Sequence, residues 1–330
     1  MGLFNKSKRK NESIFAFSES KQDEEKRNAE LIETNKTKLL ALNGCEDCQL
    51  SFVNLSGENL EEADLVGADL SNAVLDGANL KNAYLSGANL KNANLTGANL
   101  EGSSLDGANL ENAILDGVNL SFTNLSRANL VNAKLDGLNL ENANLDGANL
   151  ESATLIGANL ENASLNGANL ENANLEGANL RKARLLKAIL INANLKKTYI
   201  FGVNFEESIL KKSKFNESNS GDDNSEDLEV YYGAHFAFTD LSEVDFTDAI
   251  LAGSEFLASN LYKANFTKAD LNDASFQSAN LKEANLTDAN VKNLSIHKAI
   301  LCNTQTPWGI DNTGCKKKFK LFINTKYEEI

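Results

Sequence analysis

The amino-acid sequence predicts an all-β solenoid, and two features of its most regular stretch support this prediction. Leucine recurs at every fifth residue between Leu140 and Leu180, and alanine stands two residues before most of these leucines. A period of five fits neither an α-helix, which repeats about every 3.6 residues, nor a β-strand, which repeats about every 2.0. The five-residue unit is therefore a structural element in its own right.

The residue types within one unit indicate how it folds. The leucine and the residue two positions before it point to the same side of an extended segment, so both are expected to face the interior. The position two residues after the leucine is often glycine or asparagine, as at Gly87, Asn92 and Gly97. These residues tolerate the positive φ that a type II turn needs. Four extended pieces joined by four turns would make a coil of about twenty residues that stacks on itself.

The A-N-L-x-x pattern resembles the pentapeptide repeat family, whose unit is written A-(D/N)-L-x-x. The match covers residues 50–215 and resumes over 231–301 with its frame shifted by one residue. The resemblance implies a right-handed quadrilateral β-helix with four pentapeptides in each coil. It implies no single function, because the functions of the family are diverse and a fold does not determine a function.

The pattern divides the chain into six segments. A basic arm over residues 1–18 is expected to be disordered, and a helix followed by a Cys-x-x-Cys motif is expected over 19–49. The helix is expected to cap the open end of the solenoid, with a partner-binding helix as the alternative. The other four segments are a first solenoid, an acidic loop, a second repeat block and a C-terminal cap or tail, at residues 50–215, 216–230, 231–301 and 302–330.

The acidic loop and the second block raise two structural questions. Because the frame shifts at the loop, either the coil continues with a bulged-out loop or the rod bends there. In the second block phenylalanine alternates with leucine, and residues such as Asp248 and Lys268 replace glycine at the turn position. We therefore expect turns of a different type in this block. His235 and His297 are expected to face outward, too far apart for a metal pair or a catalytic dyad.

The four cysteines stand near the two ends of the repeat. Cys45 and Cys48 fall on inward-facing positions, which favours a structural role, with a disulfide or half of a zinc site as the alternatives. Cys302 and Cys315 enclose a short loop, so a disulfide is sterically plausible, whereas both would be free thiols in a reducing compartment. The tail after Cys315 is expected to form a cap strand or helix, with a membrane-surface segment as the alternative.

Composition and motifs argue against several classes of protein. The net charge of −14 argues against a nucleic-acid binder, which would need a basic stripe. No apolar run approaches the roughly 18 residues of a transmembrane helix, and no signal-peptide core is visible, so we expect a cytoplasmic protein. The chain has no phosphate-binding loop, HExxH or G-x-S-x-G motif. We therefore expect no enzyme, no cofactor and no metal site.

Acidic side chains of the first solenoid are expected to form columns, because residues twenty apart stack on one face. Like charges about 5 Å apart repel, so these columns should cost stability, and a solubilising coat is their simplest interpretation. Residues 181–215 instead carry nine basic and two acidic residues, with apolar residues at outer positions that indicate a contact within the chain or with a partner. The candidate interaction surface comprises Glu101, Glu111, Glu141, Glu151, Glu161, Glu171, Leu186 and Ile191.

The function expected from the sequence is that of a non-enzymatic interaction scaffold with an unknown protein partner. The resemblance adds an alternative, because some pentapeptide repeat proteins are acidic DNA mimics that protect DNA gyrase from its inhibitors. An acidic rod that binds a type II topoisomerase such as DNA gyrase is therefore the second hypothesis. By resemblance the chain is of cyanobacterial type, and its oligomeric state does not follow from the sequence.

Overall fold

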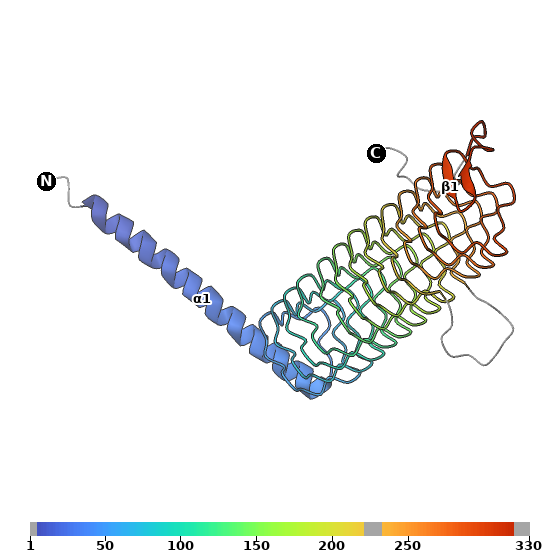
Figure 1. The fold of residues 1–330 in the computed structure, drawn as a ribbon. Helices are drawn as coiled ribbons and strands as arrows, with labels where there is room; N and C mark the ends of the chain where they lie inside the picture. The colour runs from blue at the N-terminus through green and yellow to red at the C-terminus, as the bar shows by residue number, and fades with distance from the viewer. Residues whose placement is uncertain (1–4, 221–232, 320–330) are drawn as a thin grey trace.

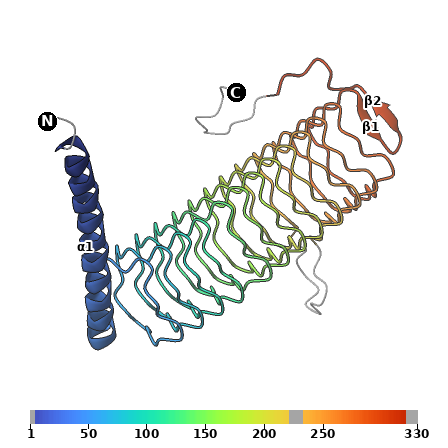
Figure 2. The ribbon, with the colours of Figure 1, turned by 90° about the vertical axis from the view of Figure 1, so that its left-hand side faces the viewer.

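The computed structural model describes residues 5–220 and 233–319, with side chains from residue 21 onward. The chain forms a β-helix solenoid with a long α-helix at its N-terminal end and a short hairpin at its C-terminal end (Figures 1 and 2). The helix, α1, spans Asn5–Leu42. The hairpin pairs β1, Thr304–Thr306, with β2, Gly309–Asp311, in an antiparallel sense.

Each coil of the first repeat block takes twenty residues, because its parallel bridges join each residue to the one twenty positions later. Bridges recur every five residues, so four columns of bridges run along the rod and define four sides of the coil. We name them sides 1 to 4 by their first bridged residues, which are Gly44, Gln49, Asn54 and Asn59. The five-residue unit predicted from the sequence is thus one side of the coil with its corner.

The core of the rod consists of the residues that the repeat predicts to face inward. Leu145 and Ala148 are fully buried, and the same holds for nearly every leucine and alanine of the pattern. Each fully buried leucine contributes about 1.5–3 kcal/mol relative to an exposed one. The corner residues adopt the left-handed conformation, with φ of 58° at Asn142 and 67° at Gly147. The prediction of inward leucines and positive-φ corners is confirmed.

The corners of the second block have the same conformation as those of the first. Asp248 and Lys268 have φ of 56° and 58°, and the amide of Ala249 donates to the carbonyl of Phe246 at 3.0 Å, as Ala143 does to Leu140. The expectation of a different turn type is therefore wrong. Stacking on neighbouring coils imposes the corner geometry even on residues for which the left-handed conformation costs about 1–2 kcal/mol.

The two repeat blocks form one continuous rod. Asn204 pairs with His235 and Asn219 with Ile250, in each case thirty-one residues later, so eleven residues beyond the normal twenty enter the chain while the coil continues. The coil includes residues up to Ser220, so the acidic loop starts later than the predicted residue 216. Residues 221–230 of that loop lie outside the described residues.

Within residues 21–42, the side-chain contacts of helix α1 with the solenoid lie in its C-terminal part. Leu39 is fully buried, Ile32 packs against the core, and the Asn35 side-chain amide donates to the carbonyl of Gln49 at 2.9 Å. The rest of the helix projects away from the rod (Figures 1 and 2). The helix begins at Asn5 and so takes in most of the segment 1–18 that the sequence predicted to be a disordered arm.

Candidate functional site

Asparagines on the sides of the rod form hydrogen-bonded ladders. On side 2, Asn129 Nδ2 donates to Asn109 Oδ1 at 3.1 Å, and Asn169 makes the same bond to Asn149 at 3.1 Å. The side-chain Oδ1 of Asn129 also accepts from the backbone N–H of Val131 at 3.3 Å. Each such asparagine therefore joins two coils and stabilises a corner, a structural role that the sequence analysis missed.

The predicted acidic surface does not come together in the structure. Its glutamates form two columns, one after side 4 and one after side 2, and ten residues of offset place them half a coil apart. The two columns therefore occupy opposite corners of the rod, and a partner bound to one side of the rod contacts only one of them. The first column holds Glu101, Glu141 and Glu161, and the second holds Glu111, Glu151 and Glu171.

Repulsion within these columns is smaller than expected. Lys81 Nζ lies 3.1 Å from the Glu101 carboxylate one coil away, and Lys91 Nζ lies 3.0 Å from that of Glu111. The Glu161 carboxylate accepts from the side-chain amide of Asn179 at 3.2 Å. Exposed ion pairs of this kind contribute about 0.2–1 kcal/mol each, so the columns are close to neutral in stability.

Apolar residues replace the asparagine ladder on part of side 2. Leu186 and Ile191 lie at the two corners that flank this side, Ile189 lies between them, and Ile209 pairs with Ile189 from the next coil. All four side chains are half-buried, and we call them the side 2 apolar patch. An isoleucine cannot make the ladder bonds, each of which contributes about 1 kcal/mol, and here it gains no place in the core.

Lysines gather on side 3, next to this patch. Five of them lie on two successive coils, at Lys196, Lys197, Lys211, Lys212 and Lys214. Lys197 and Lys212 approach Glu217 and Glu243 at 3.8 and 3.9 Å. For the other three, no carboxylate lies within 4 Å among the residues that the structure describes. The sequence indicated the positive charge of this region but not its concentration on one side.

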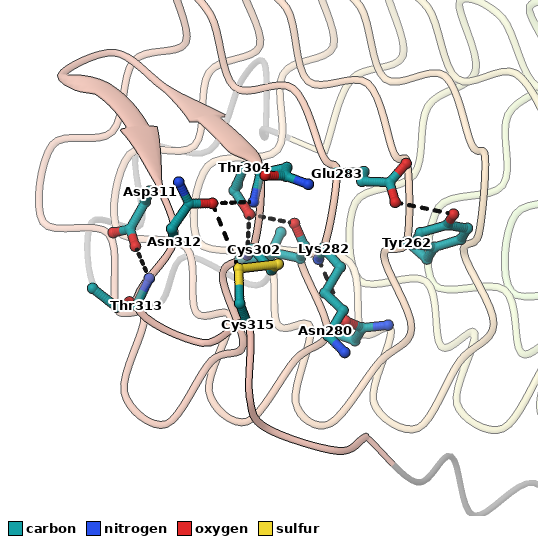
Figure 3. The surroundings of a disulfide bond; sticks show 12 residues. Tyr262, Asn280, Lys282, Glu283, Cys302, Thr304, Asp311, Asn312, Thr313 and Cys315 are labelled. Carbon is teal, nitrogen blue, oxygen red and sulfur yellow. Dashed lines mark hydrogen bonds between the residues drawn. A yellow bond between two sulfur atoms is a disulfide. The ribbon is translucent and has the colours of Figure 1, made fainter.

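Both pairs of cysteines are disulfide-bonded. Cys45 and Cys48, whose Cα atoms are 5.4 Å apart, face inward as expected and are joined to each other, which agrees with the disulfide alternative. Cys302 and Cys315, with Cα atoms 4.6 Å apart, tie the loop that carries β1 and β2 to the last coil (Figure 3). In the same region the amide of Gly314 donates to the carbonyl of Leu301 at 2.6 Å.

Within residues 21–220 and 233–319, no group of three or more His, Cys, Asp or Glu side chains could hold a metal ion. His235 Nδ1 lies 3.2 Å from the Glu255 carboxylate one coil away, which makes it part of an inter-coil contact. No helix in the described part of the chain is long and apolar enough to cross a membrane.

The family model for pentapeptide repeats matches the chain in successive, partly overlapping segments within residues 45–206 and 232–304. The chain is also similar to HetL, a pentapeptide repeat protein involved in heterocyst differentiation regulation from the cyanobacterium Nostoc sp. strain PCC 7120. The two are 27% identical, the match covers 78% of this chain and 92% of HetL, and the TM-score is 0.31.

Two other solved structures are similar over a smaller share of the chain. QnrB1, a plasmid-mediated fluoroquinolone resistance protein, is 20% identical, with 62% of this chain and 90% of QnrB1 covered and a TM-score of 0.31. Rfr23, a pentapeptide repeat protein from the cyanobacterium Cyanothece 51142, is 33% identical, with 44% and 92% covered and a TM-score of 0.16. A search of curated proteins finds no match. Structural likeness at these TM-scores carries no argument about function.

Proposed function

Because this chain belongs to the pentapeptide repeat family, we propose that it acts as a non-enzymatic protein-interaction scaffold. Columns of leucine, alanine and phenylalanine fill the interior of the rod, so contacts with other molecules must fall on its outer sides. The observation that carries the proposal is the side 2 apolar patch.

The patch breaks a local rule of the repeat without a structural gain. Asn149 and Asn169 continue the ladder up to the patch, and Ile189 and Ile209 then give up the ladder bonds while remaining half-buried at the surface. Positions of this kind are expected where function replaces stability. Apolar side chains that share one side and are bordered by charged residues fit a protein partner.

The finer features of the fold are also part of this proposal. We infer that the coil is the right-handed quadrilateral β-helix of the family. The twenty-residue step and the four bridge columns support the four-sided form, and the right-handed sense rests on membership of the family. We infer that α1 caps the N-terminal end, since Leu39 is buried against the first coil.

The pairing of all four cysteines argues against the expected cytoplasmic location, because structural disulfides persist mainly in oxidising compartments.

The alternative of an acidic DNA mimic that binds DNA gyrase receives less support from the geometry. The two glutamate columns lie on opposite corners, and Lys81, Lys91 and the side 3 lysines interrupt the acidic surface. A mimic of DNA would instead present a continuous series of negative charges.

The test is affinity capture from a cyanobacterial lysate with the intact protein and a variant carrying Leu186→Asn, Ile189→Asn and Ile191→Asn. A control variant carries Ile114→Asn and Ile156→Asn, which remove exposed isoleucines from side 3 and leave the patch intact. We expect a partner that binds the wild type and the control but not the patch variant. Equal capture by all three proteins, or no capture by any, would contradict the proposal.

A separate arm of the same experiment uses purified DNA gyrase. A variant carrying Glu151→Lys and Glu171→Lys reverses the charge at the corner after side 2, where these two glutamates are neighbours in one column. If gyrase binds the wild type but not this variant, the result would favour the DNA-mimic alternative over the scaffold proposal.

A further inference from the structure

We propose that side 3 of the rod is a self-complementary surface through which two copies of the chain pair in antiparallel orientation. Side 3 comprises the bridge column that begins at Asn54 and the corners on either side of it. This inference does not rest on the side 2 apolar patch, although Ile191 lies at the corner that sides 2 and 3 share. It concerns a different partner, a second copy of the same chain.

The sign of the surface charge changes twice along side 3. In the coils that contain Lys134, Thr154 and Asn174, every charged corner residue of side 3 is acidic, among them Glu151, Glu171 and Glu176. The next two coils carry the five side 3 lysines, and the coil after them, at Asp245, is acidic again with Glu243 and Asp248. Negative and positive bands of similar height therefore lie next to each other on one side of the rod.

A twofold axis between the coils of Asn174 and Asn194 would bring these bands into register. The axis lies in the interface and is perpendicular to the rods. Each residue then faces a residue of the same column in the second copy, and the two residues lie the same number of coils from the axis on opposite sides of it. The coil of Thr154 then faces the coil of Lys214, and the coil of Lys134 faces that of Asp245.

Column by column, this arrangement sets opposite charges against each other. Glu151 and Lys211 lie in the column after side 2, three coils apart. The axis lies midway between them, so Glu151 of one copy meets Lys211 of the other. Glu176 and Lys196 lie in the column after side 3, on neighbouring coils on either side of the axis. Glu176 of one copy therefore meets Lys196 of the other. By the same register three opposite-charge pairs form, each twice by symmetry: Glu151 with Lys211, Glu176 with Lys196, and Lys134 with Asp245.

The alternatives are less favourable. A parallel pair would set each coil against the same coil of the second copy, so Lys134 and Lys214 of the bridge column would each meet their own copy. At the corners, Glu171 would meet Glu176. The same antiparallel operation on side 1 would set Asp146 against Glu206, two acids. Lys134, Glu151 and Lys211 are exposed, and no opposite charge within 4 Å satisfies them in the described part of their own chain.

The area of the matched strip indicates that this pairing is weak. Six strands at about 4.8 Å spacing, each about three residues wide at about 3.3 Å per residue, cover roughly 300 Å² per copy. A standard stable interface buries about 800 Å² per partner. Association should therefore need high protein concentration and low salt, where complementary charges are least screened.

The test is sedimentation velocity of the full chain up to about 0.5 mM, at about 20 mM and about 500 mM NaCl. We expect concentration-dependent dimers at low salt that high salt removes. A first variant, Lys196→Glu with Lys211→Glu, makes the matched strip acidic, and a second, Glu151→Lys with Glu176→Lys, makes it basic. Each variant alone should associate at least about tenfold more weakly than the wild type, whereas their equimolar mixture should regain wild-type association.

A control variant separates this effect from a change in net charge. Glu141→Lys with Glu161→Lys shifts the net charge as the second variant does, but these residues occupy the corner opposite the glutamates after side 2. This variant should dimerise at least as well as the wild type. The proposal is overturned if the wild type stays monomeric at low salt, if either reversed variant still dimerises, or if the mixture does not. Unchanged melting curves show that all variants are folded.

Discussion

Replacing Phe236 by alanine should loosen the rod where its two repeat blocks meet. Phe236 is fully buried, and its ring stacks on Phe205 at 5.0 Å and on Phe256 at 4.8 Å between centroids. It also meets Phe246 edge to face at 5.8 Å. The contact with Phe205 crosses the junction, so this ring joins coils that come from both blocks.

The expected cost follows from the size of the cavity. A phenylalanine to alanine change in a packed core costs about 3–5 kcal/mol, and the stacked and edge-to-face contacts favour the upper part of this range. Each coil of a solenoid contacts only its neighbours, so the loss is confined to the coils around the junction. A loss of 3–5 kcal/mol corresponds to roughly 100- to 5,000-fold faster hydrogen exchange through local opening.

The assay is hydrogen exchange with mass spectrometry on the full chain, comparing peptides around residue 236 with peptides around Leu145. Phe236→Leu is the matched control, because leucine occupies most other centres of the repeat and leaves a smaller cavity. It should cost less than half as much as Phe236→Ala. Exchange at the junction that stays within threefold of wild type in Phe236→Ala would refute the view that this aromatic stack holds the blocks together.

Three further predictions concern the outer surface. Asn129→Ala removes the bond to Asn109 and the acceptor at its corner, and should lower the free energy of unfolding by about 1–2 kcal/mol in urea denaturation; no loss would contradict the role of the ladder. Phe122→Asn should stabilise the rod by up to about 1 kcal/mol, because Phe122 is 61% exposed and has a φ of 58°, a conformation that Asn142 adopts one coil away. A lower melting temperature of this variant would show that the phenylalanine ring makes a stabilising contact. Burial opposes ionisation of Asp245, but hydrogen bonds from Thr247, Asn216 and Asn265 outweigh it and lower the pKa of this carboxyl. Its contribution is present above the unfolded pKa of about 3.9 and is lost as pH falls towards the folded value, so the stability advantage of wild type over Asp245→Asn should be constant above about pH 5 and shrink below about pH 4.

The five-residue period by itself determined the coil of this protein. A leucine at every fifth position, as at Leu145, has a place in the core only if the chain turns after each short extended segment. The inward residues and the positive-φ corners therefore followed from the period, whereas the four sides per coil, and with them the stacking of residues twenty apart, were implied by the resemblance to the pentapeptide repeat family. These features depend on local geometry and on burial, which a repeat shows directly.

Only the tertiary structure decided which residues are neighbours across the junction of the two blocks. The length of the insertion before His235 does not say whether the coil resumes, because that depends on backbone pairing with Asn204. The hydrogen bonds of the ladders, such as the one from Asn129, require side chains of successive coils to meet at about 3 Å, a distance that no pattern of letters contains. The disulfide between Cys302 and Cys315 likewise depends on how the last coil and the hairpin loop pack, which brings their Cα atoms to 4.6 Å.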